Sequence, residues 1–333
     1  MKKAPKSVLL CRTDSIGDVV LTLPLAGAIK RHFPETKIYF LGVSYTKDVV
    51  CLSRNVDEFL NWSEIKNLRP DKQIEFFKLK NIECAVHVFP NKDLSKLLKA
   101  AKIPVRVGTT NRLFHWWTCT KVVPFSRKKS SLHESQLNFK LIRFLGISVP
   151  ALSEISALYG LSVLTQESEP LSHYIDKTKI NLVLHPKSKG SAREWGIENF
   201  SRLISLLPKE RVKIFIGGSK EEGNLIESLL KNHPEVINLC GVFSLKEYIH
   251  FISICDVFVA ASTGPLHIAA ALNIKALGVF APMKPIHPGR WAPVGLFAKS
   301  FVLHKECNDC KHTMKCACIL AISPIEIAKN ILE

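Results

Sequence analysis

The sequence predicts an α/β protein built from two doubly wound domains. Short apolar runs alternate with helical patterns in the first half of the chain, and the same alternation restarts after a polar stretch. The length of 333 residues is sufficient for two domains of typical size. Because strand and helix patterns that alternate along a chain are typical of a parallel sheet covered by helices, we expect two such sheets.

The first predicted domain, residues 1–165, contains four strand-like apolar runs. They are segments 7–12, 37–42, 83–89 and 105–108. Helical patterns follow these runs, at residues 19–33, 45–52, 93–101 and 133–145. Residues 162–179 are polar and have no periodicity, which is typical of a linker.

The second predicted domain, residues 178–320, repeats the pattern. Strand-like runs occupy residues 179–185, 212–218, 236–241, 257–261 and 275–282. Helical patterns occupy residues 197–207, 221–232, 245–254 and 265–272, and a last helix at 321–333 could pack back on the first domain. We expect ligands at the carboxyl ends of the strands, in a cleft between the two domains.

Composition and charge narrow the function classes. The chain is 47% hydrophobic and 23% charged, which is ordinary globular composition. No signal peptide or membrane-spanning run is visible, so we expect a cytoplasmic protein. The net charge of +17 favours an anionic partner, but the dense basic patches lack interleaved aromatic residues, which argues against nucleic acid.

A strand-to-helix turn in the second domain has the chemistry of an anion site. It consists of Ser262, Thr263, Gly264, Pro265, Leu266 and His267. Pro265 suits the first turn of a helix, and Gly264 allows close backbone approach. Free N–H groups and the helix dipole would favour a phosphate there. The simpler interpretation is a capped helix with a satisfied histidine.

A second turn, within residues 184–200, is rich in phosphate-compatible groups. These groups are Lys187, Ser188, Lys189, Gly190, Ser191 and Arg193. We expect Trp195 to anchor this loop by burial. Taken alone, the loop could be no more than a solvated basic segment.

A third turn, within residues 11–42, contains two carboxylates, Asp14 and Asp18, and Gly17. It has no G-x-G-x-x-G fingerprint, so an ordinary dinucleotide site is not expected there. A carboxylate at this sheet edge could accept a proton from an attacking hydroxyl. Helix capping by the same aspartates is an equally good interpretation.

Together these three stretches resemble the heptosyltransferases, glycosyltransferase family nine, which build the inner core of lipopolysaccharide. The resemblance rests on "RTDSIGDVVLTLPLAGAIKRHFP", "GSAREWGIENFSRLI" and "STGPLHIAAALNIKALGVFAP", in that order. It implies a GT-B fold, with the acceptor bound mainly by the first domain and the nucleotide sugar by the second. It also implies an inverting transfer that requires no tightly bound metal.

The resemblance implies roles for individual residues. Asp18 matches the carboxylate of the family's Gly-Asp pair, proposed as general base, with Gly17 and Asp14 as secondary site residues. Arg193 matches a cation suited to the departing diphosphate. The donor-binding residues implied are Ser188, Ser191, Ser262, Thr263, Gly264, Pro265, Leu266 and His267.

Two positions depart from the family pattern and leave the donor open. Ser262 stands where members that use ADP-heptose usually have Asp, and Asp14 replaces a small polar residue and could share the role of base. We expect a nucleotide diphosphate sugar, with ADP-heptose favoured, and an anionic glycolipid acceptor at the inner face of the cytoplasmic membrane. The alternatives are a nucleotide-sugar epimerase of the same fold and a non-catalytic sugar-nucleotide-binding protein.

A cysteine cluster near the C-terminus raises a separate question. Its spacing is C-x2-C-x5-C-x-C, formed by Cys307, Cys310, Cys316 and Cys318. Paired thiolates can hold zinc tetrahedrally, but the second pair is closer than in a usual zinc knuckle. A structural zinc, reduced thiols and a local disulfide all remain possible, and no metal is expected at the catalytic site.

Overall fold

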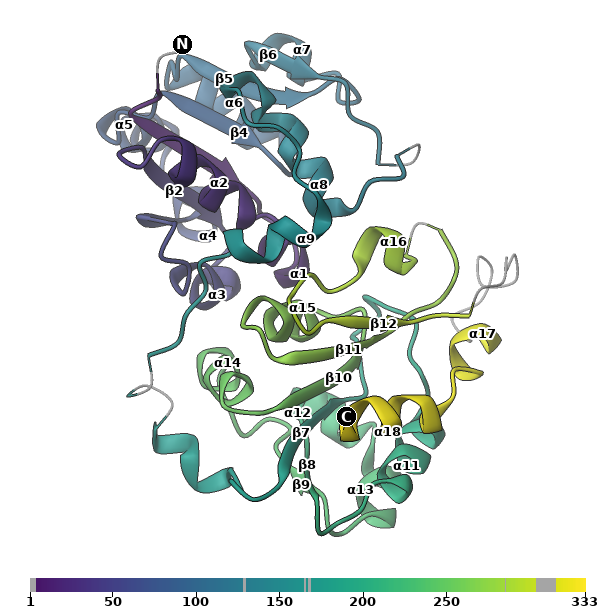
Figure 1. Ribbon diagram of the computed structural model, residues 1–333. Helices are drawn as coiled ribbons and strands as arrows, with labels where there is room; N and C mark the ends of the chain where they lie inside the picture. The colour runs from purple at the N-terminus through teal and green to yellow at the C-terminus, as the bar shows by residue number, and fades with distance from the viewer. Residues whose placement is uncertain (1–3, 128–129, 165, 167–168, 285, 304–315) are drawn as a thin grey trace. The chain divides into compact units, whose positions relative to one another are not determined.

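The computed structural model describes residues 4–127, 130–164, 166, 169–284, 286–303 and 316–333. The chain divides into two compact units, Met1–Ser162 and Val163–Glu333. Each unit contains one six-stranded parallel sheet with helices around it (Figure 1). The division falls at the start of the polar stretch 162–179.

The sheet of the first unit has the order β3-β2-β1-β4-β5-β6, with every pair parallel. The strands are β1 (Ser7–Cys11), β2 (Lys37–Gly42), β3 (Glu58–Asn61), β4 (Cys84–His87), β5 (Val105–Thr109) and β6 (Lys121–Val123). All five residues of β1 are buried, as a central strand covered on both faces requires. The strand order reverses between β1 and β4, which is where doubly wound sheets bind ligands.

Three of the four helices predicted in the first unit are shorter than the sequence pattern indicates, and the helix predicted at 93–101 has the expected length. They are α1 (Ile16–Val20), α2 (Pro24–His32), α3 (Lys47–Cys51), α4 (Trp62–Ile65), α5 (Pro70–Leu79), α6 (Lys92–Ala100), α7 (His115–Thr118), α8 (Glu134–Phe139) and α9 (Leu152–Ile155). The helix predicted at 19–33 is divided because Pro24, which has no N–H, begins α2. The helix predicted at 133–145 changes after α8 into a 3₁₀ segment, Lys140–Leu145.

The sheet of the second unit has the order β12-β11-β10-β7-β8-β9, again with every pair parallel. The strands are β7 (Ile180–His185), β8 (Val212–Ile216), β9 (Ile237–Asn238), β10 (Val257–Ala261), β11 (Lys275–Val279) and β12 (Lys299–Phe301). The order reverses between β7 and β10. The turns that follow these two strands therefore emerge at the switch point of the second sheet.

The helices of the second unit cover both faces of its sheet (Figure 1). They are α11 (Ile197–Leu206), α12 (Lys220–Asn224), α13 (Glu227–Asn232), α14 (Leu245–Ser253), α15 (Gly264–Ala271), α16 (Pro288–Trp291), α17 (Ala317–Leu320) and α18 (Pro324–Leu332). The single helix predicted at 221–232 is two helices, α12 and α13. Among the described residues, no helix combines the length and apolar character needed to cross a bilayer.

The C-terminal helix contributes to the core of the second unit. α18 packs against α11, and its apolar residues Ile327 and Ile331 belong to a core cluster of the second unit. Its buried face is therefore used within the unit that precedes it in the chain. The expectation that this helix packs back on the first domain stays a prediction, because the pattern of an amphipathic helix does not identify its partner.

Candidate active site

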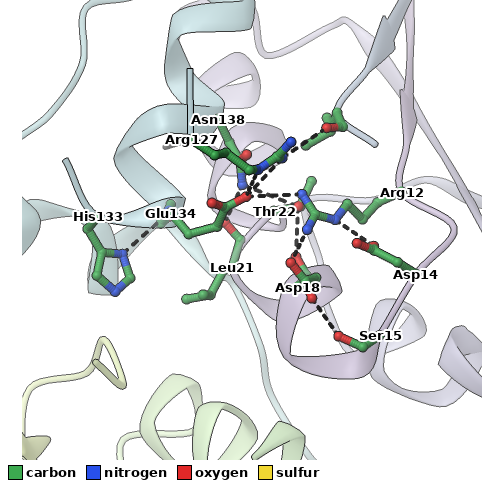
Figure 2. A network of polar contacts seen from close by, with 12 residues as sticks. Arg12, Asp14, Ser15, Asp18, Leu21, Thr22, Arg127, His133, Glu134 and Asn138 are labelled. Atoms are coloured by element: carbon green, nitrogen blue, oxygen red, sulfur yellow. Dashed lines mark hydrogen bonds and ion pairs between the residues drawn. The ribbon is translucent and has the colours of Figure 1, made fainter. Parts of the chain in front are cut away.

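Arg12 is the centre of the polar site in the first unit. It directly follows β1, is only 1% exposed, and its guanidinium contacts three carboxylates (Figure 2). Its Nε atom donates to Asp14 Oδ1 at 2.6 Å, one Nη atom donates to Asp18, and the other donates to Glu134 Oε1 at 3.4 Å. A buried guanidinium requires such partners, because its desolvation is costly when it is unpaired.

Glu134 holds this arginine from the other side. It is fully buried at the first position of α8, and Arg127 also donates to its Oε1 at 2.9 Å. Arg127 donates further to the carbonyl of Val88, just after β4, at 3.3 Å. The carboxylate therefore links α8 to both strands at the switch point of the first sheet.

Asp18 is oriented through both of its carboxylate oxygens. One accepts from Arg12, and the other accepts from the Ser15 hydroxyl at 2.5 Å (Figure 2). The Thr22 hydroxyl donates to the backbone carbonyl of Asp18 at 2.8 Å. The side chain stays partly exposed at the start of α1, so an outside hydroxyl can still reach it. An oriented, partly exposed carboxylate is compatible with the general base that the sequence predicts, and that role stays a prediction.

Asp14 is the second carboxylate that Arg12 brings to this site. Burial raises the pKa of Asp14 to about 6; Arg12 opposes that rise and the neighbouring Asp18 carboxylate adds to it. The Tyr45 hydroxyl donates to the backbone carbonyl of Asp14 at 2.8 Å. The fold thus places Asp14 and Asp18 on one guanidinium, with Gly17 in α1 between them.

In the second unit, the two turns singled out in the sequence lie next to each other. Ala260 of β10 pairs with His185 of β7 in a parallel register. The loop after β7 and the turn after β10 therefore emerge from adjacent strands at the same edge. The parallel register brings together residues that are about 75 positions apart. At the other end of the same strand pair, the Asn181 N–H of β7 donates to the carboxylate of Asp256, which directly precedes β10.

The turn after β10 has an unfilled hydrogen-bonding position. Thr263 is the N-cap residue of α15, but its side chain makes no capping hydrogen bond. Its Oγ1 atom is buried, with the residue 4% exposed, and has no hydrogen-bond partner among the described residues. Pro265 lies in the first turn and His267 is buried, as the sequence predicts. A buried hydroxyl without a partner at a helix N-terminus suits an anionic ligand.

The loop after β7 is held in shape by its own polar groups. Lys187 pairs with Glu194 at 2.5 Å, and the Ser188 hydroxyl donates to the Ala192 carbonyl at 3.1 Å. The Ser191 hydroxyl donates to the Ser188 carbonyl at 2.7 Å. Ser188 and Ser191 therefore shape the loop with their hydroxyls, and Arg193 lies half-buried after them.

Two further features of this loop set its path. Lys189 and Gly190 both have positive φ, +47° and +79°, so the chain turns sharply there. Trp195 is fully buried, and its indole N–H donates to the Ile322 carbonyl at 3.0 Å. The prediction that Trp195 anchors the loop is confirmed.

Sequence reasoning missed the partners that organise the first site. Arg12 could have been noticed because it directly follows a buried strand. Glu134 and Arg127 gave no signal, because nothing in the sequence pairs them with a residue more than a hundred positions earlier. Glu194 holds the loop after β7 through Lys187 and Ser188. It was missed because it stands among other charged residues, where a glutamate gives no distinct signal.

The cysteine cluster is only partly described. Cys307 and Cys310 lie outside the described residues, while Cys316 and Cys318 are buried in a core cluster of the second unit. Among the described residues, no group of three or more His, Cys, Asp or Glu side chains could hold a metal ion. The zinc interpretation therefore stays a prediction.

The sequence is similar to those of known heptosyltransferases. Two relatives are the Campylobacter jejuni lipooligosaccharide heptosyltransferase 2, 24% identical with 96% of each chain covered, and the Haemophilus influenzae lipopolysaccharide core heptosyltransferase OpsX, 22% identical with 85% of this chain and 81% of OpsX covered.

Two solved structures share the fold. The glycosyl transferase family 9 protein of Veillonella parvula has a TM-score of 0.80 at 16% identity, covering 100% of this chain and 99% of the other. The E. coli ADP-heptose LPS heptosyltransferase II has a TM-score of 0.76 at 16% identity, covering 98% and 97%. The two parallel sheets are those of the GT-B fold.

The sequence itself also matches a family profile over most of its length. Residues 94–319 match glycosyltransferase family 9 (heptosyltransferase), a range that includes both turns of the second unit and α8 with Glu134. The chain therefore belongs to glycosyltransferase family 9, the heptosyltransferase family, and is a glycosyltransferase.

Proposed function

We propose that this protein transfers a heptose, with inversion, from ADP-heptose to an acceptor in the lipopolysaccharide core. The names of its relatives support this choice of acceptor class, and the name of the E. coli structure supports the donor. The observation that carries the proposal is the unpartnered Thr263 hydroxyl at the N-terminus of α15.

The second unit would bind the donor. Thr263 donates its hydroxyl hydrogen to a diphosphate oxygen, and the N–H groups of the first turn of α15 face the same anion. Ser262, Gly264, Pro265 and Leu266 form that turn, and His267 follows on the same helix. Arg193 supplies the cation that offsets negative charge on the departing diphosphate.

The first unit would bind the acceptor and supply the base. The acceptor hydroxyl oxygen attacks the anomeric carbon and forms the new glycosidic bond on the face opposite the diphosphate. The bond from that carbon to the diphosphate oxygen breaks, and its electron pair leaves with ADP. The hydroxyl proton passes to Asp18, whose carboxylate is oriented by Arg12 and Ser15.

In this proposal the reaction requires no metal ion, because N–H groups and Arg193 meet the diphosphate. A chelator should therefore leave the transfer rate unchanged. A structural zinc at Cys307, Cys310, Cys316 and Cys318 is a separate proposal, which elemental analysis of the purified protein tests. One zinc per chain would support it, and a metal-free protein of full activity would reject it.

The acceptor also implies a location. A core acceptor carries lipid, so we place the enzyme in the cytoplasm, peripheral at the inner face of the cytoplasmic membrane. The net charge of +17 supports contact with an anionic surface.

The experiment that tests the function compares the protein with its Asp18→Asn variant. Purified protein is given ADP-heptose and a core glycolipid acceptor, and both products, ADP and the extended glycolipid, are measured. We expect the variant to lose at least about a hundredfold in turnover while its affinity for ADP is unchanged. Equal turnover would remove Asp18 as base and favour Asp14.

The alternatives give different results in the same assay. An epimerase would convert the donor without any acceptor present. A non-catalytic binding protein would bind ADP but release no product with any acceptor, and Asp18→Asn would then change nothing measurable.

A further inference from the structure

One segment of the first unit is entirely without negative charge. Residues 94–133 contain nine lysines and arginines and no aspartate or glutamate. The segment runs from α6 through β5, α7 and β6 (Figure 1). The ionised side chains of this segment are therefore all positive.

The same segment exposes three large apolar side chains. Leu113 is 77% exposed, Trp116 is 58% exposed and Trp117 is 55% exposed. Exposed lysines and an arginine lie around them, at Lys96, Lys99 and Arg112. We call these six residues the tryptophan–lysine surface.

Fixed contacts hold this surface in place. The Lys99 ammonium donates to the Trp117 carbonyl at 2.8 Å, and the Ser95 and Thr118 hydroxyls bond each other at 2.5 Å, which ties α6 to α7. The Trp116 indole N–H donates to the Thr110 carbonyl at 3.1 Å. The hydrocarbon edges of the rings therefore remain available to an outside partner.

The surface begins close to the site of the first unit. Residues 110–113 leave the carboxyl end of β5, and Arg12 leaves the carboxyl end of β1 in the same parallel sheet. Only β4 separates these two strands, so the two strand ends are about 10 Å apart. Of the tryptophan–lysine surface, Arg112 and Leu113 therefore lie at the same edge of the sheet as Arg12.

We propose that the tryptophan–lysine surface docks the protein on an anionic phospholipid bilayer. Tryptophan favours the headgroup level of a bilayer, and lysine and arginine favour an anionic leaflet. Leu113, the most exposed of the three apolar side chains, fits insertion among acyl chains and contributes nothing to base stacking, so lipid is favoured over nucleic acid. The inference deepens the membrane location proposed above by naming the surface responsible.

The test is flotation of the full-length protein with vesicles that contain no core glycolipid. One set of vesicles is phosphatidylcholine alone, and the other contains phosphatidylglycerol as well. We expect binding to the anionic vesicles only, weakened by added salt. The Trp116→Ala/Trp117→Ala variant and the Lys96→Glu/Arg112→Glu variant should each bind at least about tenfold more weakly.

Matched variants control for general loss of apolar or positive surface. Leu296→Ala/Phe297→Ala removes two apolar side chains of the second unit that are 68% and 61% exposed. Lys66→Glu/Lys78→Glu reverses two exposed charges of the first unit. Both control variants should bind the anionic vesicles as the unaltered protein does, and thermal unfolding verifies that all four variants fold.

The possible results separate the two proposals. If the unaltered protein binds no vesicles, both the membrane location and the docking surface are wrong. If it binds and the surface variants bind equally well, the location stands and the surface is wrong. Binding of a single-stranded oligonucleotide in place of vesicles, lost in the tryptophan variant, would identify a nucleic-acid surface and overturn the inference.

Discussion

At the residue scale, the first site is a charge arrangement around one guanidinium. Arg12 and Arg127 together supply two positive charges, while Asp14, Asp18 and Glu134 supply three negative charges when ionised. Protonation of one carboxylate therefore balances the group. The pKa of Asp14 rises, first because the carboxyl is buried, and in part because Asp18 lies beside it.

The raised pKa of Asp14 makes stability depend on pH. The carboxyl has a pKa of about 6 in the folded protein and an ordinary value of 3.8, so the folded state favours the protonated form. The contribution of the Asp14 carboxyl to stability is therefore fully present below about pH 4. As the pH rises through 6 this contribution is lost, and the free energy of unfolding falls by at most about 3 kcal/mol. Asp14→Asn, which cannot ionise, should gain in stability relative to the unaltered protein over this range.

Urea unfolding of both proteins between pH 4 and pH 7 measures the difference. The gain of Asp14→Asn should grow up to about pH 7 and then become constant. A difference in unfolding free energy that is the same at every pH would show that Asp14 titrates normally.

Glu134 should be the most costly member of the network to alter. Glu134→Gln leaves Arg12 and Arg127 without their shared buried carboxylate, and we expect a loss of about 3 kcal/mol in unfolding free energy. Glu75→Gln is the matched control, because Glu75 forms an exposed pair with Lys72 and should change stability by less than about 0.5 kcal/mol. Equal, small changes in both variants would mean that Glu134 does not hold the network.

At the element scale, the candidate sites lie where helices begin after central strands. α1 follows β1 and α15 follows β10, and both strands adjoin the point where the strand order reverses. At such a point, neighbouring connections leave toward opposite faces of the sheet and leave room for a ligand. α15 begins with an N-cap threonine, so its first turn presents N–H groups as well as the hydroxyl.

Thr263→Val tests that helix start. Valine has nearly the same shape but no hydroxyl, so the protein without ligand should be as stable as before or more stable, since a buried unpartnered hydroxyl is lost. Its affinity for ADP should fall about tenfold, the effect of one hydrogen bond to a charged group. Isothermal titration with ADP measures this affinity.

Thr263→Ser is the control for this substitution, because it keeps the hydroxyl. It should bind ADP nearly as the unaltered protein does. Unchanged ADP affinity in Thr263→Val would exclude the hydroxyl from the donor site.

At the scale of the whole molecule, our proposal assigns the donor and the acceptor to different units. Each unit has its own parallel sheet, and the second unit has core clusters on both faces of its sheet. A unit with its own core can respond to a ligand independently of its neighbour. The donor and acceptor functions proposed above can therefore be tested separately.

Hydrogen exchange with and without ADP tests this division. ADP should slow amide exchange at residues 257–272 and at 184–196, and should leave residues 7–42 unchanged, because it binds only the second unit. Protection confined to residues 7–42 would show that ADP binds the first unit, and the proposed donor site in the second unit would then be wrong.

Much of the fold could be predicted because its signals are local. A buried strand such as Val257–Ala261 has a continuous apolar run, and the turn that follows it contains residues suited to a helix start. Short elements were harder: β3, β6 and β12 have only three or four residues each, too few to show a period. Pro24 divided a predicted helix for a reason that was visible in the sequence.

By itself, the sequence determined the two doubly wound sheets and the three turns that carry the candidate residues, because strand period and turn chemistry are properties of neighbouring residues. Only the tertiary structure decided which distant groups meet. It placed Glu134 on Arg12 across 122 positions of the chain, α18 on α11, and Trp117 beside Lys99. Such contacts depend on how helices pack on a sheet, and packing partners are not encoded in the local pattern.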